Sequence, residues 1–166
     1  CEACQSMYES GLIYSAGGNA SLRIGDEVYI TATGGALGQV TPEALVRVTL
    51  DGQVLGPGKP SKELEMHLAM YRARPDARAI VHPHPPYTIA FSAKYPTPRL
   101  NAIPPLNAGF YIRGGQVPLI PYFHSGSNEL RDAVAHLSVD FHVVMLGNHG
   151  LIAAGPTLLD AINVVE

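Results

Sequence analysis

Two hairpin patterns in the first third of the chain limit the folds that it can adopt. Residues 17–35 predict two short strands joined at Gly25-Asp26, and residues 46–56 predict a second hairpin with Asp51-Gly52 at its turn. From residue 61 the apolar positions change to the i, i+3, i+4, i+7 spacing of a helix. Because hairpins alternate with helices, neither a purely parallel βαβ series nor an all-β sandwich fits. We expect an α/β fold with a central mixed, largely antiparallel sheet flanked by helices.

The helix after the second hairpin is predicted to have Ser61 as its N-cap and to end before Pro75. An apolar strand over residues 79–84 follows it. The remaining predicted elements are helices over residues 2–10, near 86–93, over 128–137 and from Thr157 onward, with strands over 116–122, 141–147 and 151–155.

Length and charge narrow the class of protein. The 166 residues, 46% of them apolar and 15% charged, are expected to form one domain over residues 1–166. The 11 Lys and Arg residues are scattered, which argues against nucleic-acid partners, and no apolar run approaches the ~20 residues that span a membrane. Cys1 and Cys4 have no second pair to complete a metal site, so we interpret them as ordinary helix residues in a reducing cytoplasm.

The predicted strand over residues 79–84 ends in the run His-Pro-His-Pro-Pro. Side chains alternate faces along a strand, so His82 and His84 would point the same way, with Cα atoms roughly 6.6 Å apart. The proline between them removes a ladder donor, and the Pro-Pro pair ends strand pairing, which places both histidines at the rim of the sheet. Two imidazoles at this spacing can bind one metal ion.

Two further segments supply candidate ligands. His149 lies in the turn "GNHG" between two apolar strands, and Glu63 lies at the start of the helix that follows Ser61. Three neutral imidazoles and a carboxylate suit Zn²⁺ or a similar divalent ion, with a position left for substrate. His67 is four residues after Glu63 but beside the apolar stripe, so we interpret it as a core or supporting histidine rather than a ligand.

Three loop segments suggest an anion pocket. "SAGGNAS" (15–21) and "TATGG" (31–35) offer backbone N–H groups, and "PSKE" (60–63) opens a helix whose free N–H groups attract an anion. Each loop type is common, but three of them beside a metal set indicate a pocket for a phosphate or a carboxylate.

The sequence resembles the class II aldolase/adducin family. The resemblance covers nearly the whole chain and rests on the fragments "GGNAS", "ITATG", "PSKELEMH", "AIVHPH", "PY…GSNEL" and "LGNHGLIAAG", in that order. The family includes L-fuculose-phosphate aldolase, L-ribulose-phosphate 4-epimerase and 3-oxo-tetronate-phosphate decarboxylase. It implies a three-layer α/β/α fold, a cytoplasmic homotetramer with sites between subunits, and Zn²⁺ or another divalent metal such as Mn²⁺, Co²⁺ or Fe²⁺.

The resemblance also assigns roles residue by residue. His82, His84 and His149 match the metal ligands, and Glu63 matches the catalytic acid/base, whose pKa we expect burial to raise. The positions that match the phosphate cradle are Asn19, Thr33, Gly34, Ser61 and Lys62. Family members continue beyond the residue at which this chain stops, so we expect a C-terminal segment to be missing.

Two positions depart from the aldolases. Lys62 stands where the aldolases have a second serine, and the form "PSKE" is closer to the decarboxylase branch. The tyrosine that the aldolases place before a Gly-Gly motif has no clear match, because Tyr111 is only nearby.

The resemblance and the predicted site together indicate a divalent-metal-dependent lyase. It would cleave a C–C bond next to a carbonyl through an enediolate, as an aldolase or decarboxylase acting on a sugar phosphate or sugar-acid phosphate. A sugar-phosphate 4-epimerase would use the same enolate and is one alternative. A non-catalytic adducin-like interaction module is another, although the presence of all three histidines and Glu63 argues against it.

Overall fold

A computed structural model describes residues 1–95, 97–104 and 106–166. Its strands are β1 (Asn19–Ile24), β2 (Glu27–Thr31), β3 (Leu45–Thr49), β4 (Ala79–His82), β5 (Leu119–Ile120), β6 (Val143–Leu146) and β7 (Gly150–Gly155). Its α-helices are α1 (Glu2–Glu9), α2 (Leu64–Ala73), α3 (Pro86–Lys94), α4 (Ala108–Arg113), α5 (Asn128–Ser138) and α6 (Leu158–Val165), with 3₁₀ turns η1 (Leu37–Gln39) and η2 (Pro42–Ala44).

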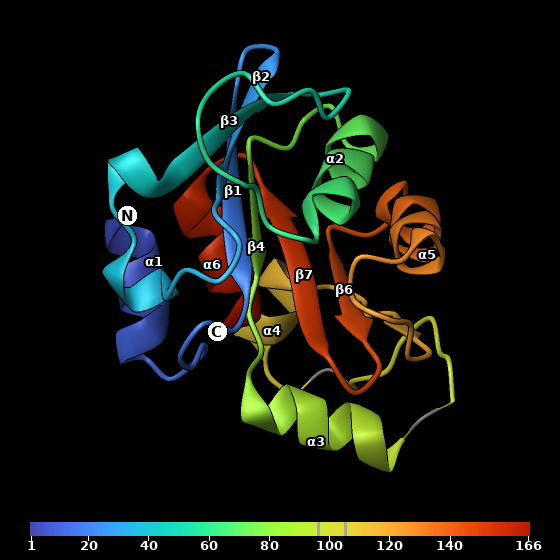
Figure 1. Ribbon diagram of the computed structural model, residues 1–166. Helices are drawn as coiled ribbons and strands as arrows, with labels where there is room; N and C mark the ends of the chain where they lie inside the picture. The colour runs from blue at the N-terminus through green and yellow to red at the C-terminus, as the bar shows by residue number, and fades with distance from the viewer. Residues whose placement is uncertain (96, 105) are drawn as a thin grey trace.

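The strands form one seven-stranded sheet in the order β3-β2-β1-β4-β7-β6-β5 (Figure 1). Every neighbouring pair is antiparallel except β5 and β6, which are parallel. The prediction of a mixed, largely antiparallel sheet is therefore confirmed.

Helices cover both faces of this sheet (Figure 1). Apolar side chains of α2 and α5, such as Leu68 and Val134, pack on one face, and those of α1 and α6, such as Met7 and Ile162, pack on the other. The central strands alternate between the two cores: in β4, Ile80 belongs to the α2–α5 core and Val81 to the α1–α6 core. This produces the three-layer α/β/α arrangement.

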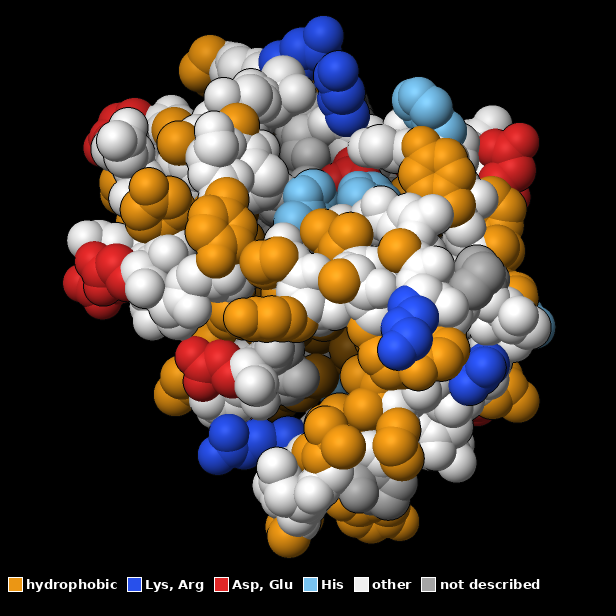
Figure 2. Space-filling view, turned by 90° about the horizontal axis from the view of Figure 1, so that it is seen from below, with side chains coloured by type: hydrophobic (Ala, Val, Ile, Leu, Met, Phe, Trp, Pro, Cys, Tyr) orange, Lys and Arg blue, Asp and Glu red, His pale blue; other side chains and the backbone are white. Residues whose placement is uncertain are grey.

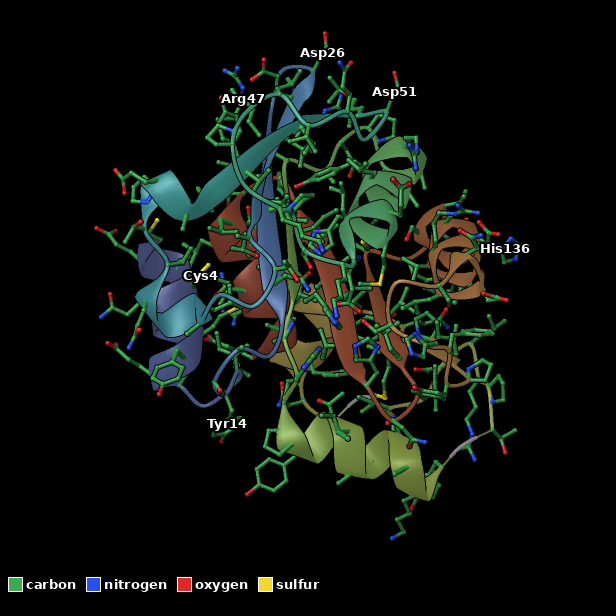
Figure 3. All side chains as sticks on the ribbon, in the orientation of Figure 1. Cys4, Tyr14, Asp26, Arg47, Asp51 and His136 are labelled. Carbon is green, nitrogen blue, oxygen red and sulfur yellow. The ribbon has the colours of Figure 1, made fainter. Side chains whose placement is uncertain are left out.

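Continuous apolar runs in β4, β6 and β7 follow from this burial on both faces. The turns that contain Asp26 and Asp51 lie at one end of the molecule (Figure 3), and α3 crosses the opposite end, where β4 finishes (Figure 1). No helix in the described ranges is long and apolar enough to cross a membrane.

Several predicted strand boundaries are wrong. β4 ends at His82, so His84 lies outside the strand, and β5 spans Leu119–Ile120 rather than residues 116–122. The second arm of the 46–56 hairpin is reduced to a single bridge between Val48 and Val54. Proline explains part of this, because Pro83 and Pro118 have no N–H group to donate to a ladder.

The start of α2 also differs from the prediction. The helix begins at Leu64 with Glu63 as its N-cap residue, so Ser61 is not the cap. Ser61 instead closes a local turn, in which its Oγ accepts a hydrogen bond from the backbone N–H of Glu63 at 3.2 Å. This turn places Glu63 at the N-terminal end of α2, just before the first helical turn.

Candidate metal centre

Four segments that are far apart in the sequence meet at one end of the sheet. His82 is the last residue of β4 and pairs in register with Asn19, the first residue of β1. His149 lies in the turn between β6 and β7, and Glu63 immediately precedes α2. One ligand atom from each of Glu63, His82, His84 and His149 lies within 4.8 Å of the other three. The fold thus brings together all four residues that the sequence singled out for the metal site and its acid/base.

The distances around Glu63 are short. Its Oε2 lies 3.1 Å from Nε2 of His82, and its Oε1 lies 3.3 Å from Nε2 of His149. Nε2 of His84 completes the group at 2.9 Å from Nε2 of His82. His84 reaches this position although it lies beyond the strand, so strand alternation was the wrong reason for a convergence that nevertheless occurs.

The tautomer of His82 shows why a cation fits here. Its Nδ1 lies 2.7 Å from the carbonyl oxygen of Leu151, which can only accept, so Nδ1 carries the hydrogen. In the neutral ring Nε2 then has a free lone pair, and that lone pair faces a carboxylate oxygen and a second imidazole nitrogen. These electron-rich groups repel unless a positive charge lies between them. A proton could serve one pair, but a divalent ion serves all four donors, and a donor set of three imidazoles and one carboxylate suits it.

Burial favours the metal-binding form of two candidate ligands, His84 and His149. Burial foremost, and then the neighbouring His82, lower the pKa of His84 to about 3 and that of His149 to about 4. At neutral pH these two rings are therefore neutral and have lone pairs to donate.

Glu63 departs from the expectation for its pKa. Burial is the largest single influence and raises it, as expected, but His82, His149 and the side chain of Asn19 together act in the opposite direction and hold the net pKa well below its usual range. Glu63 is therefore an ionised carboxylate at neutral pH, which suits a proton acceptor or a metal ligand.

Two glycines allow the candidate ligands to approach one another. A Cβ atom on Gly150 would lie 2.5 Å from the carbonyl oxygen of Pro83 and 3.0 Å from Cδ2 of His84. A Cβ atom on Gly18 would lie 2.5 Å from the carbonyl oxygen of His82. The two 2.5 Å distances are too short for any Cβ atom, so the β6–β7 turn and the 17–18 loop can close on the histidines only with glycine at these positions.

A small cavity of about 170 Å³ opens beside the four residues. Its walls contain every residue expected to hold an anion: Asn19, Thr33, Gly34, Ser61 and Lys62. Glu63, His84 and His149 line the same cavity, whereas His82 is fully buried beneath it. From this side of the molecule, His and acidic side chains lie within a hollow that has cationic side chains above it and hydrophobic ones below it (Figure 2).

The sequence analysis missed Ser125. Its Oγ lines the cavity and donates a hydrogen bond to Oε1 of Glu63 at 2.9 Å. The glycine in the fragment "HSGS" before α5 was the sequence signal for a close approach of this loop to the residues around Glu63. A Cβ atom on Gly126 would lie 2.8 Å from the carbonyl oxygen of Lys62. The amide of Asn19 is also more engaged than expected, since Nδ2 donates to Oε2 of Glu63 at 2.8 Å.

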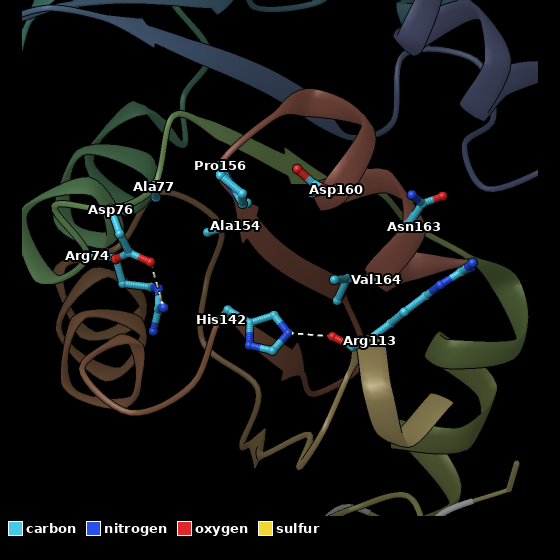
Figure 4. A pocket seen from close by; sticks show the side chains of 11 residues that line it. Arg74, Asp76, Ala77, Arg113, His142, Ala154, Pro156, Asp160, Asn163 and Val164 are labelled. Atoms are coloured by element: carbon cyan, nitrogen blue, oxygen red, sulfur yellow. Dashed lines mark hydrogen bonds and ion pairs between the residues drawn. The ribbon is translucent and has the colours of Figure 1, made fainter. Parts of the chain in front are cut away.

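A larger cavity of about 310 Å³ lies at the opposite ends of β4 and β7 (Figure 4). Its polar groups do not converge on a common point. Arg74 is paired with Asp76 at 3.0 Å, and Nε2 of His142 is 2.7 Å from the carbonyl oxygen of Arg113. These groups satisfy one another, so the smaller cavity beside the histidines is the better candidate site.

The metal-free protein should lose stability as the pH falls from about 6.5 towards 4. Burial foremost lowers the pKa of His67 and of His84 to about 3, and that of His149 to about 4, so the unfolded chain binds protons in this range that the folded chain does not. The contribution of each of these histidines to the free energy of unfolding is fully present above its pKa in the unfolded chain. Below that pKa the contribution declines, by up to about 1.4 kcal/mol per pH unit for each histidine. Urea unfolding of EDTA-treated protein between pH 7.5 and 5 measures this. A midpoint that stays constant over that range would contradict the neutral, buried histidines.

The family comparison agrees with the site. The family model described as the class II aldolase and adducin N-terminal domain matches residues 1–166. The chain is 37% identical over 163 residues to a 3-oxo-tetronate 4-phosphate decarboxylase of Haemophilus influenzae, covering 98% of this chain and 78% of that protein. It is 34% identical over 158 residues to an L-fuculose phosphate aldolase of Methanococcus maripaludis, covering 95% of this chain and 83% of that protein.

Solved structures show the same fold. The crystal structure of YgbL of Escherichia coli has a TM-score of 0.93 with 33% identity, covering 98% of this chain and 80% of that chain. An L-fuculose 1-phosphate aldolase has a TM-score of 0.88 with 29% identity, covering 99% of this chain and 76% of that chain. The chain therefore belongs to the class II aldolase and adducin family.

Proposed function

We propose that this class II aldolase family member is a divalent-metal-dependent lyase that cleaves a C–C bond next to a carbonyl in a phosphorylated sugar or sugar acid. One observation carries the proposal: Glu63 and three histidines converge beside a cavity whose other walls are the loops expected to bind an anion. The relatives named as decarboxylases and aldolases act on substrates of this class. An adducin-like interaction module would have no need of an ionised, buried carboxylate facing three imidazoles.

His82, His84 and His149 would hold the metal, with Glu63 close enough to act as a further ligand. We propose Zn²⁺, because three neutral imidazoles leave one position of a tetrahedral site open, although the donor set also accepts Mn²⁺, Co²⁺ or Fe²⁺. A bound divalent ion supplies a Lewis acid that stabilises negative charge on a substrate oxygen next to the bond that breaks.

Glu63 would transfer the proton. Its carboxylate is ionised and lies at the wall of the cavity, so it can accept a proton from a substrate hydroxyl and return one to carbon after it has itself been protonated. Asn19 and Ser125 donate to its two oxygens at 2.8 Å and 2.9 Å and so limit its rotation. The loop containing Thr33 and Gly34 and the turn at Ser61 would bind the phosphate.

Two observations favour decarboxylation over aldol cleavage. Lys62 places a cation at the cavity, where the family resemblance implies serine in the aldolases, and a sugar-acid phosphate carries a carboxylate as well as a phosphate. The chain is also somewhat more similar to the decarboxylase than to the aldolase, at 37% against 34% identity. In a 3-oxo acid, the electron pair of the bond to the departing carboxylate moves into the neighbouring carbonyl, and the carbon left behind then takes up a proton.

The products distinguish the possible reactions. The purified, zinc-loaded enzyme should release CO₂ from 3-oxo-tetronate 4-phosphate. A ketose 1-phosphate cleaved as by an aldolase would yield a triose phosphate and an aldehyde without CO₂, and an epimerase would yield a product of unchanged mass. Mass spectrometry combined with a CO₂ assay separates these outcomes. Absence of turnover with 3-oxo-tetronate 4-phosphate and with every ketose phosphate tested would contradict the proposed function.

Replacing Lys62 by serine should raise KM for 3-oxo-tetronate 4-phosphate by about tenfold or more. A charge-assisted hydrogen bond to an anion contributes about 1.5–3 kcal/mol, and serine would keep only a neutral donor. Zinc content should not change, since the Lys62 side chain is exposed and Lys62 is not one of the four clustered residues. Lys59→Ser on the same loop is the matched control. Unchanged kinetics in the Lys62 variant would remove the main residue-level reason to prefer decarboxylation.

We further propose a homotetramer in the cytoplasm, with sites completed by a neighbouring subunit, as the family resemblance implies. The surface supports association: Tyr87, Leu106, Tyr111 and Ile112 are large apolar residues that are 66–89% exposed. Exposed apolar side chains of this size favour association where they lie together. Sedimentation velocity of the purified protein measures the assembly state.

A further inference from the structure

A row of buried polar side chains runs from Glu63 into the core beneath α2. Asn19, Ser21, His67 and Tyr71 are each at most 5% exposed. Burial of four polar side chains in a row is costly unless each has a hydrogen-bond partner. The proposed function accounts for Asn19 as a neighbour of Glu63, but it gives no role to the other three.

The contact between Asn19 and Glu63 sets the direction of the row. An ionised carboxylate can only accept hydrogen bonds, so the atom of Asn19 that lies 2.8 Å from Oε2 must be the amide nitrogen. The amide oxygen then points the other way, towards Nε2 of His67 at 2.5 Å. Because that oxygen only accepts, Nε2 of His67 must carry a hydrogen.

The rest of the row follows from the tautomer of His67. A neutral ring with hydrogen on Nε2 has a lone pair on Nδ1, which accepts the hydroxyl hydrogen of Ser21 at 2.8 Å. Ser21 has then used its only hydrogen, so the 3.0 Å contact with Tyr71 must be donated by the tyrosine. Burial foremost raises the pKa of Tyr71, which keeps this last donor protonated.

We propose that His67 is a positioning residue that holds the Asn19 amide in the one orientation in which it donates to Glu63. All four hydrogen bonds in the row are donated in the direction of the carboxylate, from Tyr71 through Ser21, His67 and Asn19. If His67 donated nothing, the Asn19 amide could rotate and turn its oxygen towards Glu63, which would repel the carboxylate. The inference rests on the proposed function, in which Glu63 transfers the proton.

The tautomer of His67 is the direct test. In zinc-loaded protein with ¹⁵N-labelled histidine, long-range ¹H–¹⁵N spectra should show His67 as a neutral ring protonated at Nε2 from pH 5.5 to 8. The His67→Gln variant identifies its signals by their loss. A neutral ring with its hydrogen on Nδ1 would reverse the direction of the row and overturn the proposal whether or not any variant folds.

Kinetics separate a positioning role from a purely structural one. His67→Leu fills the same core space without a donor, and we expect kcat to fall about 10–100-fold, as for residues that orient a catalytic group, with KM and zinc content within twofold of wild type. His67→Gln retains an N–H donor and should recover most of the loss. Tyr71→Phe, at the far end of the row, should have a smaller effect than His67→Leu.

His136→Leu controls for the loss of a histidine, because His136 projects from the outer face of α5 (Figure 3). A His67→Leu enzyme with kcat within twofold of wild type, or a His67→Gln enzyme as slow as His67→Leu, would overturn the proposal. A wild-type enzyme without turnover would instead contradict the proposed function alone. An active enzyme in which His67 has the other tautomer would contradict the positioning role alone.

Discussion

Replacing Glu63 by glutamine should lower kcat by about 10²–10⁴-fold, the range that general acid–base catalysis contributes. Glutamine has nearly the same shape and can still contact Asn19 and Ser125, but it cannot accept and return a proton. The variant should keep its fold and most of its zinc, because three imidazoles remain. Steady-state kinetics, with zinc measured by mass spectrometry in the same preparation, test this expectation.

Glu65 provides the matched control for this variant. It lies two residues further along the chain, in the first turn of α2, where it pairs with Arg72 at 3.5 Å on the exposed face. Glu65→Gln should leave kcat near the wild-type value. If the Glu63→Gln enzyme turned over normally, the proton would have to be transferred by a residue outside this cluster.

Replacing His84 by alanine should lower zinc affinity and activity together, by at least about tenfold. Loss of residues that merely orient metal ligands already costs 10–100-fold, and His84 would be a direct ligand. Of the three histidines, His84 is the most informative to remove, because His82 is fully buried and its loss would leave a polar cavity in the core. Zinc titration against a chelating indicator, followed by kinetics at saturating zinc, separates affinity from chemistry.

If His84 is a ligand, zinc affinity and activity should fall together in the His84→Ala enzyme and in no control. His136→Ala on the exposed face of α5 should change neither zinc affinity nor kcat. Saturating zinc should restore part of the activity of the His84→Ala enzyme, since the other donors remain in place. Full zinc occupancy and full activity at limiting zinc would rule out His84 as a ligand.

Elements whose turn residues, caps and apolar spacing all lie within one short segment were predicted well. The β1–β2 hairpin turns at Gly25 as expected, and α5 occupies Asn128–Ser138 against a prediction of residues 128–137. Ser127 caps α5 by accepting from the backbone N–H of Leu130 at 3.2 Å, so a local hydrogen bond sets its start. The short helix α4, Ala108–Arg113, was missed, because it follows a proline-rich segment and has no apolar periodicity long enough to recognise.

Residue types and loop positions were enough to name the candidate metal ligands, but the local geometry expected for two of them was wrong. His82 and His84 were expected to share a strand, yet β4 stops at His82 and the chain turns before His84 joins the cluster. The expected rise in the pKa of Glu63 was also wrong in its net direction. Burial does raise this pKa, but His82, His149 and Asn19, which lie far from Glu63 in the sequence, together lower it by more.

The sequence by itself determined the types of residue, their order and the elements that carry them: three imidazoles, one carboxylate, and glycines where the backbone must pass close to a ring. These features depend on local chemistry, which a linear pattern contains. Only the tertiary structure decided that His67 faces Asn19, that Ser125 reaches Glu63 and that the carboxylate stays ionised. Those contacts join residues separated by 48 and 62 positions. They form because the pairing of β1 with β4 and the packing of α2 against α5 bring distant segments within hydrogen-bond distance, and no local pattern encodes the angle at which they meet.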